Sequence, residues 1–188
     1  WEVRRLEYYL SDFSFQNSKG QWISVFSMPE LVNAEKGPHT FTLVGVPVGE
    51  YTGLRFMVGI PDNQNKTGYL ENTLENFNMA WPENLNGGYH HMKFEGNYLD
   101  LDNEIVGFTV HLGDKGMQAV NTFENVTIPI AVGGANLSLT MNPNDTITLE
   151  NPYTYDFNVD GNYTMAVYDL MELVSKNGYN CMSLNVPL

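Results

Sequence analysis

The chain has 188 residues, 43% of them apolar and 13% aromatic, which is enough to bury a core and too apolar for a disordered protein. Its net charge is −13, from nine Lys and Arg against 22 Asp and Glu, so neither nucleic acid nor an anionic membrane surface is expected as a partner. The sequence contains no run of about 18 apolar residues that would predict a transmembrane segment, and we expect one domain over residues 1–188.

A period of two dominates the chain and predicts strands. In LEYYLSDFSF, residues 6–15, the side chains of Leu6, Tyr8 and Leu10 share one face of an extended segment. Turn residues separate further strand candidates at short spacing, which is typical of an all-β antiparallel sandwich. These candidates cover residues 39–46, 51–60, 89–96, 104–113, 124–132, 135–141, 145–151 and 153–159.

One segment has helical periodicity. Residues 164–176, TMAVYDLMELVSK, place apolar side chains three and four positions apart, and Asn162 or Thr164 can cap such a helix. The predicted fold is therefore an all-β antiparallel sandwich with one short C-terminal helix. Residues 61–88 are polar and without a clear period, and connections of this length are usually functional or mobile.

The histidines are the best candidates for chemistry, because the sequence contains no nucleophile elbow, phosphate-binding loop or HExxH motif. His111 lies in GFTVHLG, on the face of its strand opposite the apolar side chains. His90 and His91 are neighbours in NGGYHHMKFEG, and neighbours on a strand point to opposite sides. At most one of these two can therefore join His111 in a site, and the pattern leaves open which one. A single strand histidine is more often a structural residue than a ligand.

The order of several segments resembles the MbnP-like copper-binding family. YYLSDF near the start is followed by VPVGEY, which leads into LRFMVGIPDNQN, and then by Met79 and Trp81 in MAW. NGGYHHMKFEG and HLG complete the series. The resemblance covers roughly residues 6 to 113, and it rests on the shared order of these segments, since no single motif is specific.

The resemblance implies a β-sandwich that is secreted. It would be exported to the periplasm, or held at the outer membrane or cell surface, often as a lipoprotein. Its expected role is copper binding in copper acquisition or homeostasis, not catalysis. The chain begins at Trp1 rather than Met, and we expect a targeting or lipid-anchoring segment before it. In characterised relatives one copper ion is held by two histidines and a tryptophan oxidised to kynurenine, and a di-haem peroxidase partner performs the oxidation.

By the same resemblance, His111 corresponds to the histidine of the family's HLG block, and Trp81 is the retained tryptophan. Where many relatives carry the second histidine, this chain reads SVFSMPEL, residues 24–31, without one. We expect His90 or His91 to take its place.

A thioether can complete such a copper site, and Met28 and Met79 are the candidates. A second interpretation keeps the sandwich and loses the metal. In it Trp81, Tyr89 and the loop 61–88 present aromatic side chains to a glycan or a protein at the cell surface. If both aromatics are instead buried, they only fix the loop against the core, which is the more common fate of such residues.

Overall fold

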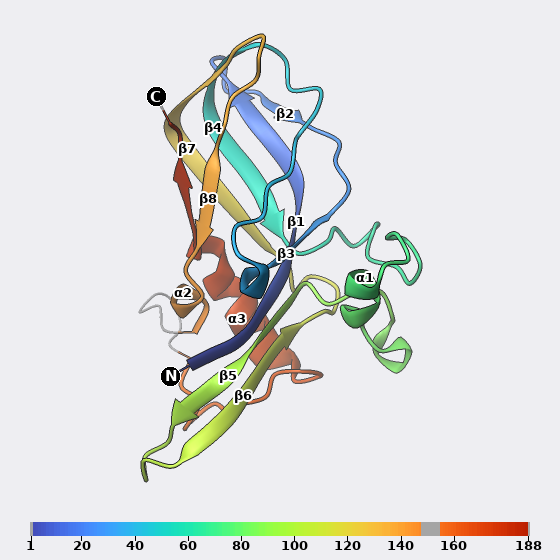
Figure 1. Cartoon of the computed structure of the whole chain (residues 1–188), viewed down its shortest axis with the longest axis vertical. Coiled ribbons are helices and arrows are strands. Elements are labelled where there is room, and N and C mark those ends of the chain that lie inside the picture. Colours follow the sequence, from blue (N-terminus) through green and yellow to red (C-terminus); the bar gives the residue numbers. More distant parts are fainter. Residues whose placement is uncertain (1, 148–154, 188) are drawn as a thin grey trace.

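The computed structural model describes residues 2–147 and 155–187, which form the predicted antiparallel β-sandwich with a short C-terminal helix (Figure 1). The strands are β1 (Glu2–Asn17), β2 (Trp22–Ser24), β3 (Glu30–Asn33), β4 (Gly49–Val58), β5 (Met92–Leu99), β6 (Ile105–Leu112), β7 (Ala119–Ile130), β8 (Ser138–Met141) and β9 (Met182–Asn185). The helices are α1 (Leu74–Asn78), α2 (Asn144–Ile147) and α3 (Tyr168–Asn177).

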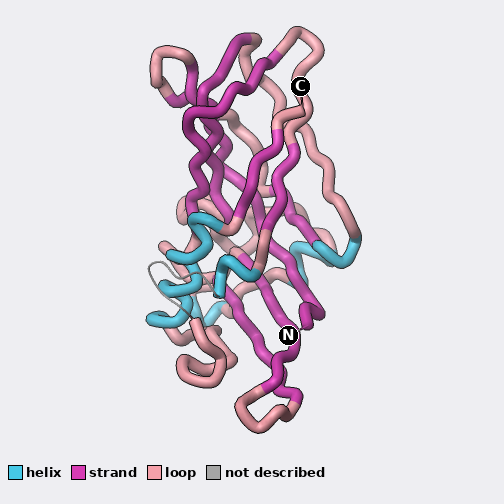
Figure 2. The backbone as a smooth tube through the Cα atoms, turned by 90° about the vertical axis from the view of Figure 1, so that its left-hand side faces the viewer, coloured by secondary structure: helices cyan, strands magenta, loops and turns pink. Residues whose placement is uncertain are grey.

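Strand β1 is shared by both halves of the main sheet, whose order is β6-β5-β1-β4-β7. The first half of β1 pairs with β5 and the second half with β4. Both partners lie on the same side of β1, because β3 occupies the other side at Tyr8 and at Leu10. Strands β4 and β5 therefore meet end to end beside β1, one carrying β7 and the other β6 (Figure 1). The strands run along most of the long axis, with the helices beside them (Figure 2).

The meeting point of β4 and β5 lies at Tyr9. The Tyr9 N–H donates to the His91 carbonyl at 3.1 Å, and the Tyr9 carbonyl accepts from the Gly59 N–H at 2.8 Å. The His91 ring spans the same gap: Nδ1 accepts from the Ile60 N–H at 3.1 Å, and Nε2 donates to the Asp114 carbonyl at 3.0 Å. Fully buried His91 therefore joins the ends of β4 and β5 to the chain that follows β6.

Apolar side chains of β1, β4, β5 and β7 fill a continuous core. Phe13, Phe56, Phe94 and Ile128 are at most 1% exposed, and burying a side chain of this size is worth about 1.5–3 kcal/mol. Partly buried apolar side chains from residues 37–48, β8, β9 and α3 pack against this core. The alternating pattern therefore reports the inner face of the sandwich.

Three predicted strands are wrong in the described residues. Residues 39–46 follow an irregular path, although Phe41 packs against the core. Residues 145–147 lie in the helical turn α2, and residues 155–159 form a loop and a turn. Residues 148–154 lie outside the described residues. A chain that crosses a core surface buries alternate side chains whether or not it has a strand partner, so period two overpredicts strands here.

The segment 61–88 is ordered by a small second core. Leu70 and Met79 from this segment are buried with Tyr9, Ile60 and Tyr89. The C-terminal helix begins at Tyr168, and Val167 occupies its N-cap without a side-chain hydrogen bond, so the predicted caps are wrong. Within the part of the chain that the structure describes, no helix is long and apolar enough to cross a membrane.

The junction predicts how replacing His91 changes stability. His91→Phe keeps the ring volume but leaves the Ile60 N–H and the Asp114 carbonyl without partners, and we expect a loss of about 2–4 kcal/mol in the free energy of unfolding at pH 7. Burial lowers the pKa of His91 from 6.5 to about 4.

The unfolded chain therefore takes up this proton first, and the contribution of neutral His91 is complete above pH 6.5 and is lost as pH falls towards 4. Urea unfolding of the wild type and the variant, with a metal chelator present, should show a stability difference that shrinks between pH 7 and pH 4. A difference that stays constant over this range would contradict the structural role of the ring.

Candidate metal centre

Three aromatic rings lie in a row beside the junction of β4 and β5. The His90 ring lies between those of Trp81 and His111, with centroid distances of 4.8 Å and 4.9 Å and interplanar angles of 81° and 88°. Trp81 and His90 are 2% and 4% exposed, and His111 is partly buried on β6. The structure thus brings together three of the four residues predicted for a metal site.

Each histidine of this pair has one ring nitrogen fixed and one free. His90 Nδ1 donates to the Met79 carbonyl at 3.0 Å, and His111 Nε2 donates to the Glu95 carboxylate at 2.8 Å. His90 Nε2 and His111 Nδ1 are buried and have no hydrogen-bond partner among the described residues. Because the protons sit on the fixed nitrogens, the two free nitrogens carry lone pairs. This is the arrangement in which proteins present imidazole to a metal.

Burial keeps both rings neutral. It lowers the pKa of His90 to about 2, and the Lys93 ammonium adds to this effect. Burial also lowers the pKa of His111, against the opposing effect of the Glu95 carboxylate. A neutral imidazole is the form that binds a metal, so no proton has to leave the site first at neutral pH.

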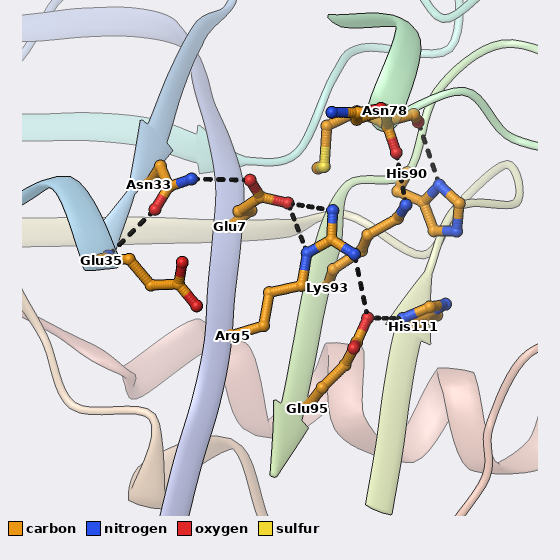
Figure 3. Close-up of polar contacts among 10 residues, drawn as sticks. Arg5, Glu7, Asn33, Glu35, Asn78, His90, Lys93, Glu95 and His111 are labelled. Atoms are coloured by element: carbon orange, nitrogen blue, oxygen red, sulfur yellow. Dashed lines mark hydrogen bonds and ion pairs between the residues drawn. The ribbon is translucent and has the colours of Figure 1, made fainter. Parts of the chain in front are cut away.

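A chain of charged side chains connects His111 to the other edge of β1. Glu95 bonds Arg5 at 3.3 Å, Arg5 bonds Glu7, and Glu7 accepts from the Asn33 side chain at 2.7 Å (Figure 3). These contacts hold the Glu95 carboxylate in position at His111. Figure 3 shows the two histidine rings next to each other at one end of this chain.

A second support comes from the end of α1. The Lys93 ammonium is buried and donates to the Asn78 carbonyl. The next carbonyl, that of Met79, accepts both the backbone N–H of His90, at 2.7 Å, and its ring Nδ1–H. The loop 61–88 therefore supplies the group that orients His90.

His91 lies outside this group, although the β5–β6 register favours it. Lys93 is directly opposite His111 in the β5–β6 register, so strict alternation would put His91 on the face of His111. The chain bends at residue 91, and β5 begins only at Met92, so the alternation does not extend back to the histidine pair. Both His91 nitrogens are used by the junction.

Trp81 packs against the chain just after β6 because of a glycine. A Cβ added at Gly113, in the HLG motif, would overlap the Trp81 ring. The Trp81 Nε1–H donates to the Leu85 carbonyl at 2.7 Å, which fixes the indole plane. Since Trp81 and Tyr89 are 2% and 6% exposed, they anchor the loop 61–88 and offer no free aromatic face to a glycan or protein ligand.

The donor set near the two histidines is small. Over residues 2–147 and 155–187, no three His, Cys, Asp or Glu side chains are grouped so that they could hold a metal ion together. Met28 lines a groove between β3 and α1 and is 43% exposed, whereas Met79 is buried in the second core. The two free imidazole nitrogens fit a soft ion of low coordination number, such as Cu(I).

Sequence reasoning missed Glu95 as a partner of the site. The residue lies two positions after Lys93 on β5, and Lys93 pairs with His111, so Glu95 is a diagonal neighbour of His111 across the ladder. Once the β5–β6 hairpin is aligned, this spacing identifies it. The sequence alone leaves the register of the hairpin open, because the turn between the two strands is long.

Comparison with known proteins supports one family. A family model described as MbnP matches residues 1–166. The solved structure of MbnP from Methylosinus trichosporium is 16% identical, with a TM-score of 0.48, over 77% of this chain. The match spans 65% of the length of that protein, which is less than two thirds. No curated protein matches the chain.

The contact between Gly113 and Trp81 predicts the effect of one added methyl group. Gly113→Ala should displace the indole from His90 and lower the free energy of unfolding by about 1–3 kcal/mol, as overpacking of a core does. Near-ultraviolet circular dichroism and thermal unfolding measure both effects. Gly107→Ala, on β6 itself, is the matched control, because its added Cβ meets no other atom closer than 3.9 Å. Equal behaviour of the two variants would contradict the packing.

Proposed function

The chain belongs to the MbnP family, and from this premise we propose that it is an extracytoplasmic copper-binding protein acting in copper acquisition or homeostasis, and not an enzyme. The observation that carries the proposal is the pair of buried imidazole nitrogens, His90 Nε2 and His111 Nδ1, whose rings lie 4.9 Å apart and whose other nitrogens are held by fixed acceptors. These two nitrogens would hold the copper ion.

The charges around the pair favour a monovalent ion. Arg5 and Lys93 carry two positive charges near the histidines, and Glu7 and Glu95 carry two negative charges, so the group is neutral before an ion binds. Both carboxylates form ion pairs with Arg5, and the Lys93 ammonium balances the second negative charge. No negative charge is therefore left over to balance a second positive charge on the ion. A buried divalent ion would cost more than a monovalent one in such surroundings. The proposal is therefore for Cu(I).

Removing either ligand tests the proposal. His90→Ala and His111→Ala should each weaken Cu(I) binding by at least about 100-fold, beyond the 10–100-fold typical of losing an outer partner of a ligand. Competition with a coloured Cu(I) chelator measures the affinity and the stoichiometry, which we expect to be one ion per wild-type chain.

His39→Ala is the matched control. His39 lies beside Glu30 at the groove between β3 and α1, with no contact to the ring pair, so this variant should bind Cu(I) like the wild type. Unchanged Cu(I) affinity in His90→Ala would sink the assignment of this ligand.

For Trp81 we extend the proposal to the oxidation known from relatives. The unmodified indole has no nitrogen lone pair to offer, because that pair belongs to the aromatic ring system and indole is a donor only. Its Nε1–H donates to the Leu85 carbonyl. Its ring packs on His90, so the opened ring of kynurenine would place new polar groups beside the copper ligands. By family resemblance, a di-haem peroxidase would be the partner that performs this oxidation.

Peptide mass spectrometry on protein purified from its native cells tests this extension. We expect a gain of one oxygen and a loss of one carbon on the peptide that carries Trp81. The peptide that carries Trp22 is the internal control, because Trp22 lies on β2 with its ring under Arg55, away from the histidines, and should keep its mass. Copper-loaded protein with an unmodified Trp81 would contradict the extension and leave the two-histidine site standing.

A further inference from the structure

The outer edge of β6 is covered by a short piece of the C-terminal segment. β6 ends the order of the main sheet, so the backbone groups on its outer side need partners other than a neighbouring strand of that sheet. Residues 162–164 supply them. Asn162 Nδ2 donates to the Gly107 carbonyl at 2.8 Å, the Thr109 N–H donates to the Asn162 carbonyl at 2.8 Å, and the Thr164 N–H donates to the Thr109 carbonyl at 3.2 Å.

At His111 a side chain continues this ladder. The His111 N–H donates to Thr164 Oγ1 at 2.8 Å, and the Thr164 hydroxyl donates to the His111 carbonyl, also at 2.8 Å. One hydroxyl thus satisfies both outward backbone groups of the residue that carries the free Nδ1. Thr164 is 0% exposed, so water cannot replace it in this position.

The chemistry explains why a hydroxyl residue is needed. A hydroxyl can donate and accept at the same time, which an aliphatic side chain cannot. The backbone cannot continue the ladder here, because the chain turns away after Thr164 and Ala166 adopts a left-handed conformation at φ 62°. A non-glycine residue in this region is strained, and such strain persists where the surroundings hold it in place.

We infer that Thr164 is a positioning residue for His111: its hydroxyl fixes the backbone of this ligand from the outer edge of β6, while Glu95 fixes the ring from inside the sheet. The inference rests on the proposed function only for its effect on copper. It gives residues 162–164, which the sequence pattern marks only as a helix start, a part in the proposed metal site.

The consequence of losing the hydroxyl is local. Without it, the His111 N–H and carbonyl are buried and unpaired, and an edge strand in that condition frays. The free nitrogens of His90 and His111 then no longer keep a fixed separation. Metal affinity depends on such preorganisation, and losing an outer support of a ligand typically costs 10–100-fold.

The test compares Thr164→Val with Thr164→Ser in the full chain. Valine keeps the shape and removes the hydroxyl, whereas serine keeps the hydroxyl. We expect Thr164→Val to bind Cu(I) about 10–100-fold more weakly, by chelator competition, and to lose hydrogen-exchange protection at the His111 amide. Thr164→Ser should restore both to near the wild-type values.

Ser175→Ala is the matched control for a general loosening of the C-terminal segment. Ser175 is also buried, and its hydroxyl donates to the Gln118 carbonyl, away from His111. This variant should leave Cu(I) affinity and His111 amide exchange unchanged.

Two results would overturn the inference: wild-type affinity and protection in Thr164→Val, or failure of Thr164→Ser to restore them. If the wild type binds no Cu(I), the proposed function fails separately. Protection of the His111 amide in the Val and Ser variants then still decides the role of Thr164.

Discussion

The end-to-end meeting of β4 and β5 beside β1 is the constraint on which the rest of the structure depends. Two strands that share one side of a third leave backbone groups without ladder partners where they abut, and buried groups in that condition are costly. Tyr9 bridges the gap with its backbone, and His91 bridges it with its ring. Because this junction fixes where β5 starts, it also fixes the position of His90 and, through the β5–β6 register, that of His111.

Adjacent histidines therefore have opposite roles for a physical reason. His91 has both nitrogens committed to backbone groups, so it stabilises the fold and has no lone pair to offer a metal. His90 has one nitrogen committed and one free. The difference does not come from burial, since both rings are buried. It comes from the number of backbone groups within reach of each ring.

The sequence predicts the sandwich and most of its strands, because alternation records which face of a strand is buried. It also leads to His111 and to one member of the histidine pair. It cannot choose between His90 and His91, because that choice depends on a bend at residue 91 that interrupts the alternation. Thr164 shows the same limit: a residue type suited to capping a helix instead bonds an edge strand 53 positions earlier in the chain. Local propensity carries no information about such distant partners.

The overall charge and the candidate site act at different ranges. A net charge of −13 attracts cations of every kind to the surface, and this attraction weakens with salt. It cannot distinguish copper from calcium or magnesium, which prefer oxygen ligands. The two buried imidazole nitrogens can distinguish these ions, because imidazole is a poor ligand for calcium and magnesium and a good one for copper. In the proposed copper site, selectivity would therefore depend on keeping carboxylates off the ion. The hydrogen bond that His111 Nε2–H donates to Glu95 does so by holding this carboxylate on the far side of the ring from Nδ1.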